Sequence, residues 1–411
     1  MTGIAFRLSS LLTLLWTASF LLFRPSILGE RYNAVVLVIF LLVTSVIIFV
    51  NQKQRVRINT ITFSTYFLII ISVLYFFVQG LILSDATRTV VNSGIFLLLV
   101  VTSIMLVVSV HQKKVIEIFI WCHYLMSISA IITFTLYILG GFSLQHLSVA
   151  SLYDLVRYAD LDPERPFSNH LLIFPFSIIW SATSIFGLEV PRFVGIYREP
   201  GMAQIFFCTA FAFSLFANVK NKRLKQVTIL IGTFLTFSAA GFINVILVIL
   251  LYLIMNGSFK EYVLRLFRNP FLVILIFIIL IVVVYQSNLM VQERLSQVSG
   301  MGRVESFKRG AELLLENPVF GEGYYNSFKK DKEGIIISDN FIGILGVSYQ
   351  IGLIGLFLYF APWIFRVLTT RKLFYCIYVP CLMTLLFSQP SYNDAFVYLL
   401  LLINPNNLVY E

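Results

Sequence analysis

The segment at residues 192–201 reads R-F-V-G-I-Y-R-E-P-G and joins two long apolar runs. Pro200 suits the first turn of a helix, because a proline lacks the N–H that would have no intrahelical partner there. We therefore expect a membrane-length helix to begin near Met202, with free N–H groups and its positive dipole end beside Arg198. Such a helix end can bind a phosphate at the edge of a bilayer. The alternative is that Arg192 and Arg198 anchor the helix end among lipid headgroups.

The composition indicates a polytopic membrane protein. Hydrophobic residues make up 59% of the chain and charged residues 12%. The apolar runs have the length of helices, so an all-α fold is predicted rather than a barrel of short alternating strands. The net charge of +10 is concentrated in short basic loops, so topology explains it and no nucleic acid is expected as a partner.

The basic loops orient the predicted spans. Loops such as the one with Lys113 and Lys114 face the cytoplasm by the positive-inside rule, which gives about 12 spans with both termini inside. Three regions follow: a membrane region at 1–140 with about five spans, an outer loop at 141–200, and a second membrane region at 201–411. The last region contains a large outer loop at 287–340, which we expect to be catalytic, an inner basic loop with Arg366, and a short final span at 395–404.

Two apolar runs need a special reading. A crossing at 169–187 would place the basic loop at 220–225 outside, so this run is predicted to be re-entrant or interfacial, with a bend at Pro175. The run at 226–256 is about 46 Å long as a helix, too long for one straight crossing. It is predicted to form two helices that meet at 238–241, on the outer side.

The outer loop at 287–340 contains a predicted helix from Gly302 to Asn317, closed by Pro318 and two glycines. Its alternating charges form a stripe that indicates a solvated face, made by Glu305, Arg309, Glu312 and Glu316. Arg303 lies on another face, near the helix N-terminus, and is the preferred anion ligand. 

Other polar residues have two readings each. Asp339, with Asn340, is either an ordinary N-cap of the next span or a general base. The outer tyrosines Tyr197 and Tyr324, with Asn340, are candidate contacts of an acceptor sugar, although tyrosines are enriched at any membrane interface. His123 is expected to satisfy a helix–helix hydrogen bond. The histidines lack metal-ligand spacing, so no metal site is indicated.

Four segments in one order resemble the bacterial O-antigen polymerase and ligase superfamily. They are R-F-V-G-I-Y-R-E-P-G (192–201), L-T-F-S-A-A-G (235–241), R-V-E-S-F-K-R-G-A-E-L-L-L-E-N-P-V-F-G-E-G (303–323), and the Asp339-Asn340 pair followed by G-L-I-G (352–355). The resemblance covers roughly 190–356, whereas the first half of the chain is similar only as membrane spans.

The resemblance implies a GT-C-type, metal-independent and cofactor-free inverting glycosyltransferase. Such enzymes take glycan from undecaprenyl pyrophosphate on the outer face of the bacterial inner membrane. By analogy, Arg303 with Arg192 or Arg198 would hold the pyrophosphate, since the guanidinium fork binds phosphate bidentately. Asp339 or Glu199 would act as base.

Two departures from the family pattern affect the finer assignment. Ligases of this superfamily tend to have His where Asp339 stands, which favours the polymerase branch. Many members also have Arg where this chain has Ala239, so Arg192 or Arg198 would substitute for that cation. The alternatives are a ligase that passes glycan to lipid A core or to protein, and a flippase of lipid-linked oligosaccharide. A chain-length regulator is a possible partner of a polymerase.

Overall fold

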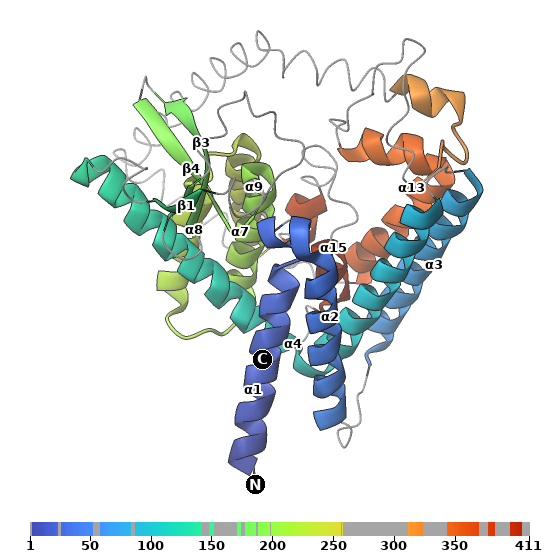
Figure 1. Ribbon diagram of the computed structural model, residues 1–411, viewed down its shortest axis with the longest axis horizontal. Helices are drawn as coiled ribbons and strands as arrows, with labels where there is room; N and C mark the ends of the chain where they lie inside the picture. The colour runs from blue at the N-terminus through green and yellow to red at the C-terminus, as the bar shows by residue number, and fades with distance from the viewer. Residues whose placement is uncertain are drawn as a thin grey trace.

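The fold is that of a computed structural model, in which the described residues are 2–23, 26–51, 58–83, 87–141, 148–151, 171–173, 177–185, 188–197, 199–255, 257, 311–323, 343–369, 377–382 and 395–404. Most of them are helical (Figure 1). Among these described residues, four helices are long and apolar enough to cross a membrane, which identifies a membrane protein.

The first half of the chain consists of long helices: α1 (Thr2–Leu21), α2 (Ile27–Val50), α3 (Thr60–Leu83) and α4 (Thr87–Gly140). The backbone of α4 is non-helical at His111, so the helix has two arms, 87–110 and 112–140. One arm lies beside α3 and the other runs toward the small sheet (Figure 1). The kink lies next to Lys113 and Lys114, where the sequence predicts a basic loop between two spans.

A four-stranded antiparallel sheet makes the all-α prediction incomplete. Its strands, in spatial order, are β1 (Ser148–Ser151), β2 (Leu171–Ile173), β3 (Ser177–Ile185) and β4 (Leu188–Gly195). The run at 169–187 therefore forms β2 and β3, and Ile173 pairs with Ser177 across the position of Pro175. The chain reverses where the bend was predicted, but as strands, because antiparallel pairing satisfies the backbone groups of a run rich in β-branched residues.

The second half begins with three helices, α7 (Pro200–Phe216), α8 (Lys222–Phe234) and α9 (Ala239–Met255). The start of α7 at Pro200 confirms the predicted helix start. The predicted division of 226–256 into two helices is also confirmed, with residues 235–238 between them. Phe237 lies in the left-handed region at φ 44°, a conformation that a helix cannot contain.

Two further helices pack against the helices of the first half. The first, α13 (Gly343–Thr369), packs along α3, and the second, α15 (Ala395–Leu402), is buried at every residue. With 8 residues, α15 is about 12 Å long. The predicted final span at 395–404 is therefore a short core helix in contact with α3, α4 and α13, and it is too short to cross a bilayer alone.

Polar contacts join segments of several helices at one end of the bundle. His111 Nε2 lies 3.4 Å from Ser9 Oγ and 3.1 Å from Asn51 Nδ2. Gln112 exchanges two hydrogen bonds with the backbone of Asn404, at 2.6 and 2.8 Å. These are ends that the positive-inside rule assigns to the cytoplasm, so the contacts agree with the predicted alternation of spans, while the side of the membrane stays a prediction.

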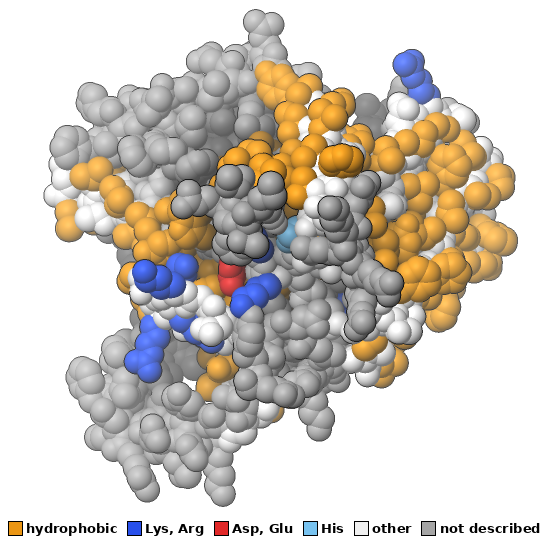
Figure 2. Space-filling view, turned by 90° about the horizontal axis from the view of Figure 1, so that it is seen from below, with side chains coloured by type: hydrophobic (Ala, Val, Ile, Leu, Met, Phe, Trp, Pro, Cys, Tyr) orange, Lys and Arg blue, Asp and Glu red, His pale blue; other side chains and the backbone are white. Residues whose placement is uncertain are grey.

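Lysine and arginine side chains gather on this same end of the molecule. Figure 2 views it from below and shows blue side chains next to a red patch, with apolar surface at the flanks. Lys113, Lys220 and Arg223 are exposed; Lys220 lies in the connection between α7 and α8, and Arg223 lies in the first turn of α8. A basic end face beside apolar flanks is the pattern that the positive-inside rule describes.

Labelling of single cysteines tests this arrangement. Cysteines introduced as Lys113→Cys and Lys220→Cys should react with a membrane-impermeant maleimide only after the cells are permeabilised, because the positive-inside rule assigns both positions to the cytoplasmic side. Leu139→Cys, near the far end of the second arm of α4, should react from outside, and the parent chain gives the background from its native cysteines. Labelling of positions 113 and 220 from opposite sides would contradict the topology.

Candidate functional site

Two of the four family-like segments contact each other at β4. The backbone N–H of Phe193 donates to the carbonyl of Leu235 at 3.0 Å. Arg192 Nε donates to the carbonyl of Thr236 at 3.4 Å. The connection between α8 and α9 is therefore held against β4, and the half-buried Arg192 guanidinium is fixed beside it, which brings residues 192–201 and 235–241 together as one unit.

Tyr197 is a packing residue in this structure. Its side chain is fully buried, its hydroxyl lies 2.7 Å from His123 Nε2, and its ring stacks on Phe206 with centroids 4.2 Å apart. The predicted helix–helix role of His123 thus takes a different form, because its partner is the segment that precedes α7. Tyr197 has no exposed face to offer an acceptor sugar, so its predicted sugar contact is not carried further.

The N-terminus of α7 offers an anion fewer donors than the sequence predicts. Glu199 is the N-cap residue, and its carbonyl accepts hydrogen bonds from the N–H groups of Met202 and Ala203 at 3.1 and 2.9 Å. Pro200 has no N–H to give. Phosphate binding here would therefore depend on cationic side chains more than on the helix end.

The other two family-like segments are joined by an exchange of backbone hydrogen bonds. α13 is broken at Gly352, and the N–H groups that follow the break, of Leu353 and Ile354, donate to the carbonyls of Pro318 and Val319 at 2.8 and 3.2 Å. The carbonyls before the break accept in return: that of Tyr349 from Glu322 N–H at 2.8 Å, and that of Gln350 from Gly323 N–H at 3.0 Å. We call residues 318–323 with 349–354 the clasp. 

Glycines make the clasp possible. Gly352 has φ 65° and ψ −175°, a conformation essentially restricted to glycine. A Cβ atom there would lie 2.4 Å from the carbonyl oxygen of Val319, and one on Gly321 would lie 2.5 Å from the carbonyl oxygen of Gln350. The two chains therefore touch backbone to backbone, and any side chain at either position would force them apart.

The helix predicted at Gly302–Asn317 is described only at its end. Residues 311–316 are helical, and a turn at 317–320 follows, which agrees with the predicted stop at Pro318. Glu312 and Glu316 are exposed, as expected for a solvated stripe. 

Five predicted site residues lie outside the described residues, namely Arg198, Arg303, Tyr324, Asp339 and Asn340. The predicted stripe residues Glu305 and Arg309 lie outside them as well, as do most of the loop 287–340 and Pro175. Of the predicted site, the structure describes Arg192, Tyr197 and Glu199.

The two pairs of family-like segments lie apart. In Figure 1, β4 and α7–α9 lie on one side of α1, α2 and α15, whereas α13 and α3 lie on the other. 

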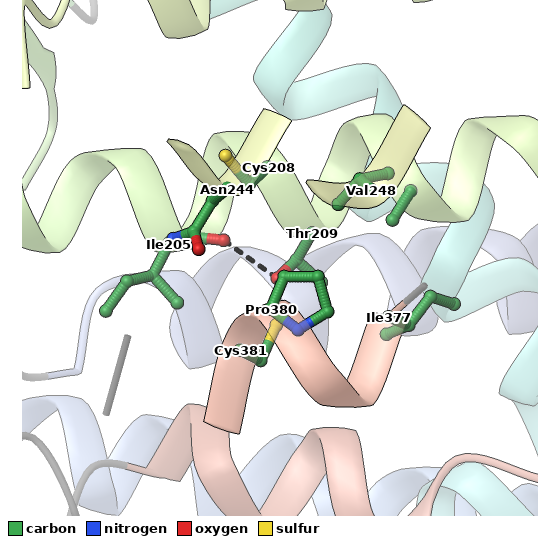
Figure 3. A pocket seen from close by; sticks show the side chains of 9 residues that line it. Ile205, Cys208, Thr209, Asn244, Val248, Ile377, Pro380 and Cys381 are labelled. Carbon is green, nitrogen blue, oxygen red and sulfur yellow. Dashed lines mark hydrogen bonds between the residues drawn. The ribbon is translucent and has the colours of Figure 1, made fainter. Parts of the chain in front are cut away.

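An apolar crevice lies between α7, α9 and residues 377–382 (Figure 3). Thr209 Oγ1 and Cys381 Sγ lie 3.2 Å apart across it, and Asn244 also lines it. The crevice is too narrow to admit a water molecule. It is a seam of the core rather than a substrate site.

One cation lies elsewhere than its sequence context predicts. Arg366, predicted in an inner basic loop, is fully buried near the end of α13, where it donates to the carbonyls of Leu401 and Ile403. The last carbonyls of a helix lack intrahelical partners, and a cation there is favourable. Arg366 therefore caps α15, a role that sequence could not reveal because the two helices are far apart in the chain.

Metal ligation has no support among the described side chains, where no group of three His, Cys, Asp or Glu converges. The metal-independent reaction implied by the family resemblance stays a prediction, since the outer loop lies mostly outside those residues.

Comparison with known proteins supports the relationship that the motifs indicate. The sequence model of a family described as O-antigen ligase matches residues 226–360, which include most of α8, all of α9 and the clasp. This match supports the O-antigen ligase and polymerase superfamily, whose members are glycosyltransferase-like membrane enzymes that act on lipid-linked glycans. It does not separate the ligase from the polymerase branch. No curated protein and no solved structure matches the chain.

Replacing Gly352 by Ala tests the clasp. Gly352→Ala should lower the free energy of unfolding by about 3 kcal/mol, because the added Cβ combines a forbidden backbone conformation with a backbone clash. Gly141→Ala is the matched control: Gly141 has φ 60° but nothing within 4 Å of its added Cβ, so only about 1–2 kcal/mol of backbone strain is expected. Thermal unfolding in detergent compares the two, and equal losses would contradict the contact.

Proposed function

We propose that the protein polymerises lipid-linked oligosaccharide repeat units. It transfers the growing glycan from undecaprenyl pyrophosphate onto the next lipid-linked repeat, with inversion, on the outer face of the bacterial inner membrane. The observation that carries this proposal is the pairwise assembly of the family-like segments: residues 192–201 contact 235–236, and residues 318–323 contact 349–354. Each segment alone is a weak indication of the superfamily. The fold brings the segments together in pairs, which lie within the range of the family match or next to it.

The proposed donor site is built from arginines. Arg303 grips the diphosphate together with Arg192 or Arg198, and their planar forks stay charged and bind phosphate oxygens bidentately. The position of Arg192 on β4 supports this role. Its Nε donates to the carbonyl of Thr236, in the same segment as Ala239, where many family members have an Arg. The cations stabilise the leaving diphosphate as negative charge develops on it.

The proposed reaction is a single displacement. An acceptor sugar hydroxyl forms a bond to the anomeric carbon from the face opposite the diphosphate, and the bond from that carbon to the diphosphate oxygen breaks, so the diphosphate leaves with the electron pair. Asp339 or Glu199 takes the hydroxyl proton. Tyr324 and Asn340 are proposed to contact the acceptor sugar.

A ligase is the second candidate, because the family whose model matches residues 226–360 is described as O-antigen ligase. It would use the same donor and pass glycan to lipid A core or to protein. The Asp at position 339, where ligases tend to have His, is the reason to prefer the polymerase. A flippase is less well supported: the described buried cation, Arg366, is engaged in capping α15 and does not line a path.

Deletion of the gene separates these classes by the glycan that accumulates. Loss of a polymerase should leave single repeat units on the cell surface, whereas loss of a ligase should leave lipid-linked polymer. Loss of a flippase should retain the intermediates inside the cell. Surface polymer of normal length in the deletion strain would overturn all three.

Arginine variants test the proposed donor site. Arg303→Ala and Arg192→Ala should each lower polymer formation by about 100-fold or more, because each removes a cation that stabilises the leaving group. Purified protein with a defined lipid-linked repeat unit gives the readout as a product ladder. Arg223→Ala, an exposed cation on the opposite end, should retain the ladder. A normal ladder from Arg192→Ala and from Arg198→Ala would show that neither replaces the missing cation.

A further inference from the structure

We infer that Gln79 of α3 is a positioning residue that holds the clasp, and through it the outer loop, in register with α13. Gln79 lies outside the range of the family match, in a half of the chain that is similar to the superfamily only as membrane spans. The structural part of this inference stands on contacts alone. Its consequence for the reaction rests on the proposed function.

The Gln79 amide joins both sides of the clasp. Its Nε2 donates to the carbonyl of Phe320 at 2.6 Å and to the carbonyl of Gln350 at 2.7 Å. A glutamine amide nitrogen has two N–H donors, so one side chain can serve both acceptors at once. Gln79 is 5% exposed, and the carbonyls that it links are 30 positions apart in the chain, one in the outer segment and one just before the break in α13.

The identity of the residue matters at this position. If the amide were reversed, Oε1 would face two carbonyl oxygens, so the contacts fix the nitrogen toward the clasp. A glutamate of the same shape would put a carboxylate against those two carbonyls. An alanine would remove the amide donor of the Phe320 carbonyl, whereas the Gln350 carbonyl would keep the Gly323 N–H. An unsatisfied acceptor in apolar surroundings is costly, so both changes should open the clasp rather than be absorbed.

The clasp connects the two segments that bear the proposed catalytic groups. Residues 318–323 are the end of the family-like segment that begins with Arg303, and α13 begins three residues after Asn340. Gln79, which belongs to α3, links Phe320 at the end of the first segment to Gln350 in the first part of α13. It thereby limits how far the proposed diphosphate ligand and the proposed base can move relative to each other.

Hydrogen exchange of the full-length protein in nanodiscs tests the structural part without any substrate. In the parent chain, the amides of Glu322, Gly323, Leu353 and Ile354 should exchange slowly because each donates to a carbonyl of the clasp. Gln79→Glu and Gln79→Ala should accelerate their exchange by about tenfold or more. Unchanged exchange in both variants would overturn the inference.

Ser72→Ala is the matched control. Ser72 is a buried residue of the same helix, and its Oγ donates across to α13 at the carbonyl of Leu358, at 2.6 Å, away from the clasp. The variant removes one bond between α3 and α13 but leaves the Gln79 contacts in place. Its clasp amides should exchange as in the parent chain, and equal acceleration would show that Gln79 is merely part of general helix packing.

Glycan transfer by the same variants tests the consequence for the reaction. Gln79→Ala and Gln79→Glu should lower kcat by about tenfold or more with little change in KM for the lipid-linked repeat, because alignment is lost rather than binding. Faster exchange with unchanged kcat would confine Gln79 to a structural role. If the parent chain transfers no glycan, the proposed function fails, and the role in the reaction fails with it, whereas the exchange data still judge the clasp.

Discussion

The exchange of backbone hydrogen bonds across the break in α13 is the constraint on which the candidate site depends. A helix that stops and restarts inside a membrane protein leaves N–H and C=O groups without intrahelical partners. In apolar surroundings each such group costs several kcal/mol unless another part of the protein satisfies it. Here residues 318–323 supply two acceptors and two donors, and Gln79 adds its amide. The break and the outer segment therefore stabilise each other, and neither arrangement is expected to persist alone.

The same requirement recurs wherever the described backbone departs from regular structure. The connection between α8 and α9 is bonded to β4 through the Leu235 and Thr236 carbonyls, and the end of α15 is capped by Arg366. A membrane protein can carry irregular backbone at depth only where protein groups or a water-filled cavity satisfy it. The family-like segments at 235–241 and 352–355 lie at two of these irregular places.

This arrangement suits the proposed chemistry. Transfer of a glycan from a lipid diphosphate without a metal requires cationic side chains in a fixed geometry. Charges that are already in place stabilise the leaving diphosphate, so the protein does not have to reorganise during the reaction. Arg192 has such a support in β4 and the α8–α9 connection. The segment after Arg303 has one in the clasp. Figure 1 places the two supports on opposite sides of the molecule, so the proposal requires the outer loop to bring the arginines together.

The sequence by itself determined what depends on local pattern. Long apolar runs gave the membrane class, Pro200 gave the start of α7, and excess length gave the division between α8 and α9, because helix geometry and proline chemistry act over a few residues. Tertiary structure decided the rest. The run at 169–187 became strands, Tyr197 was enclosed by His123 and Phe206, and Arg366 turned inward to cap α15. Gln79 acquired its role from carbonyls that lie 241 and 271 positions away. Such roles are set by partners that only folding brings near, and no local pattern records them.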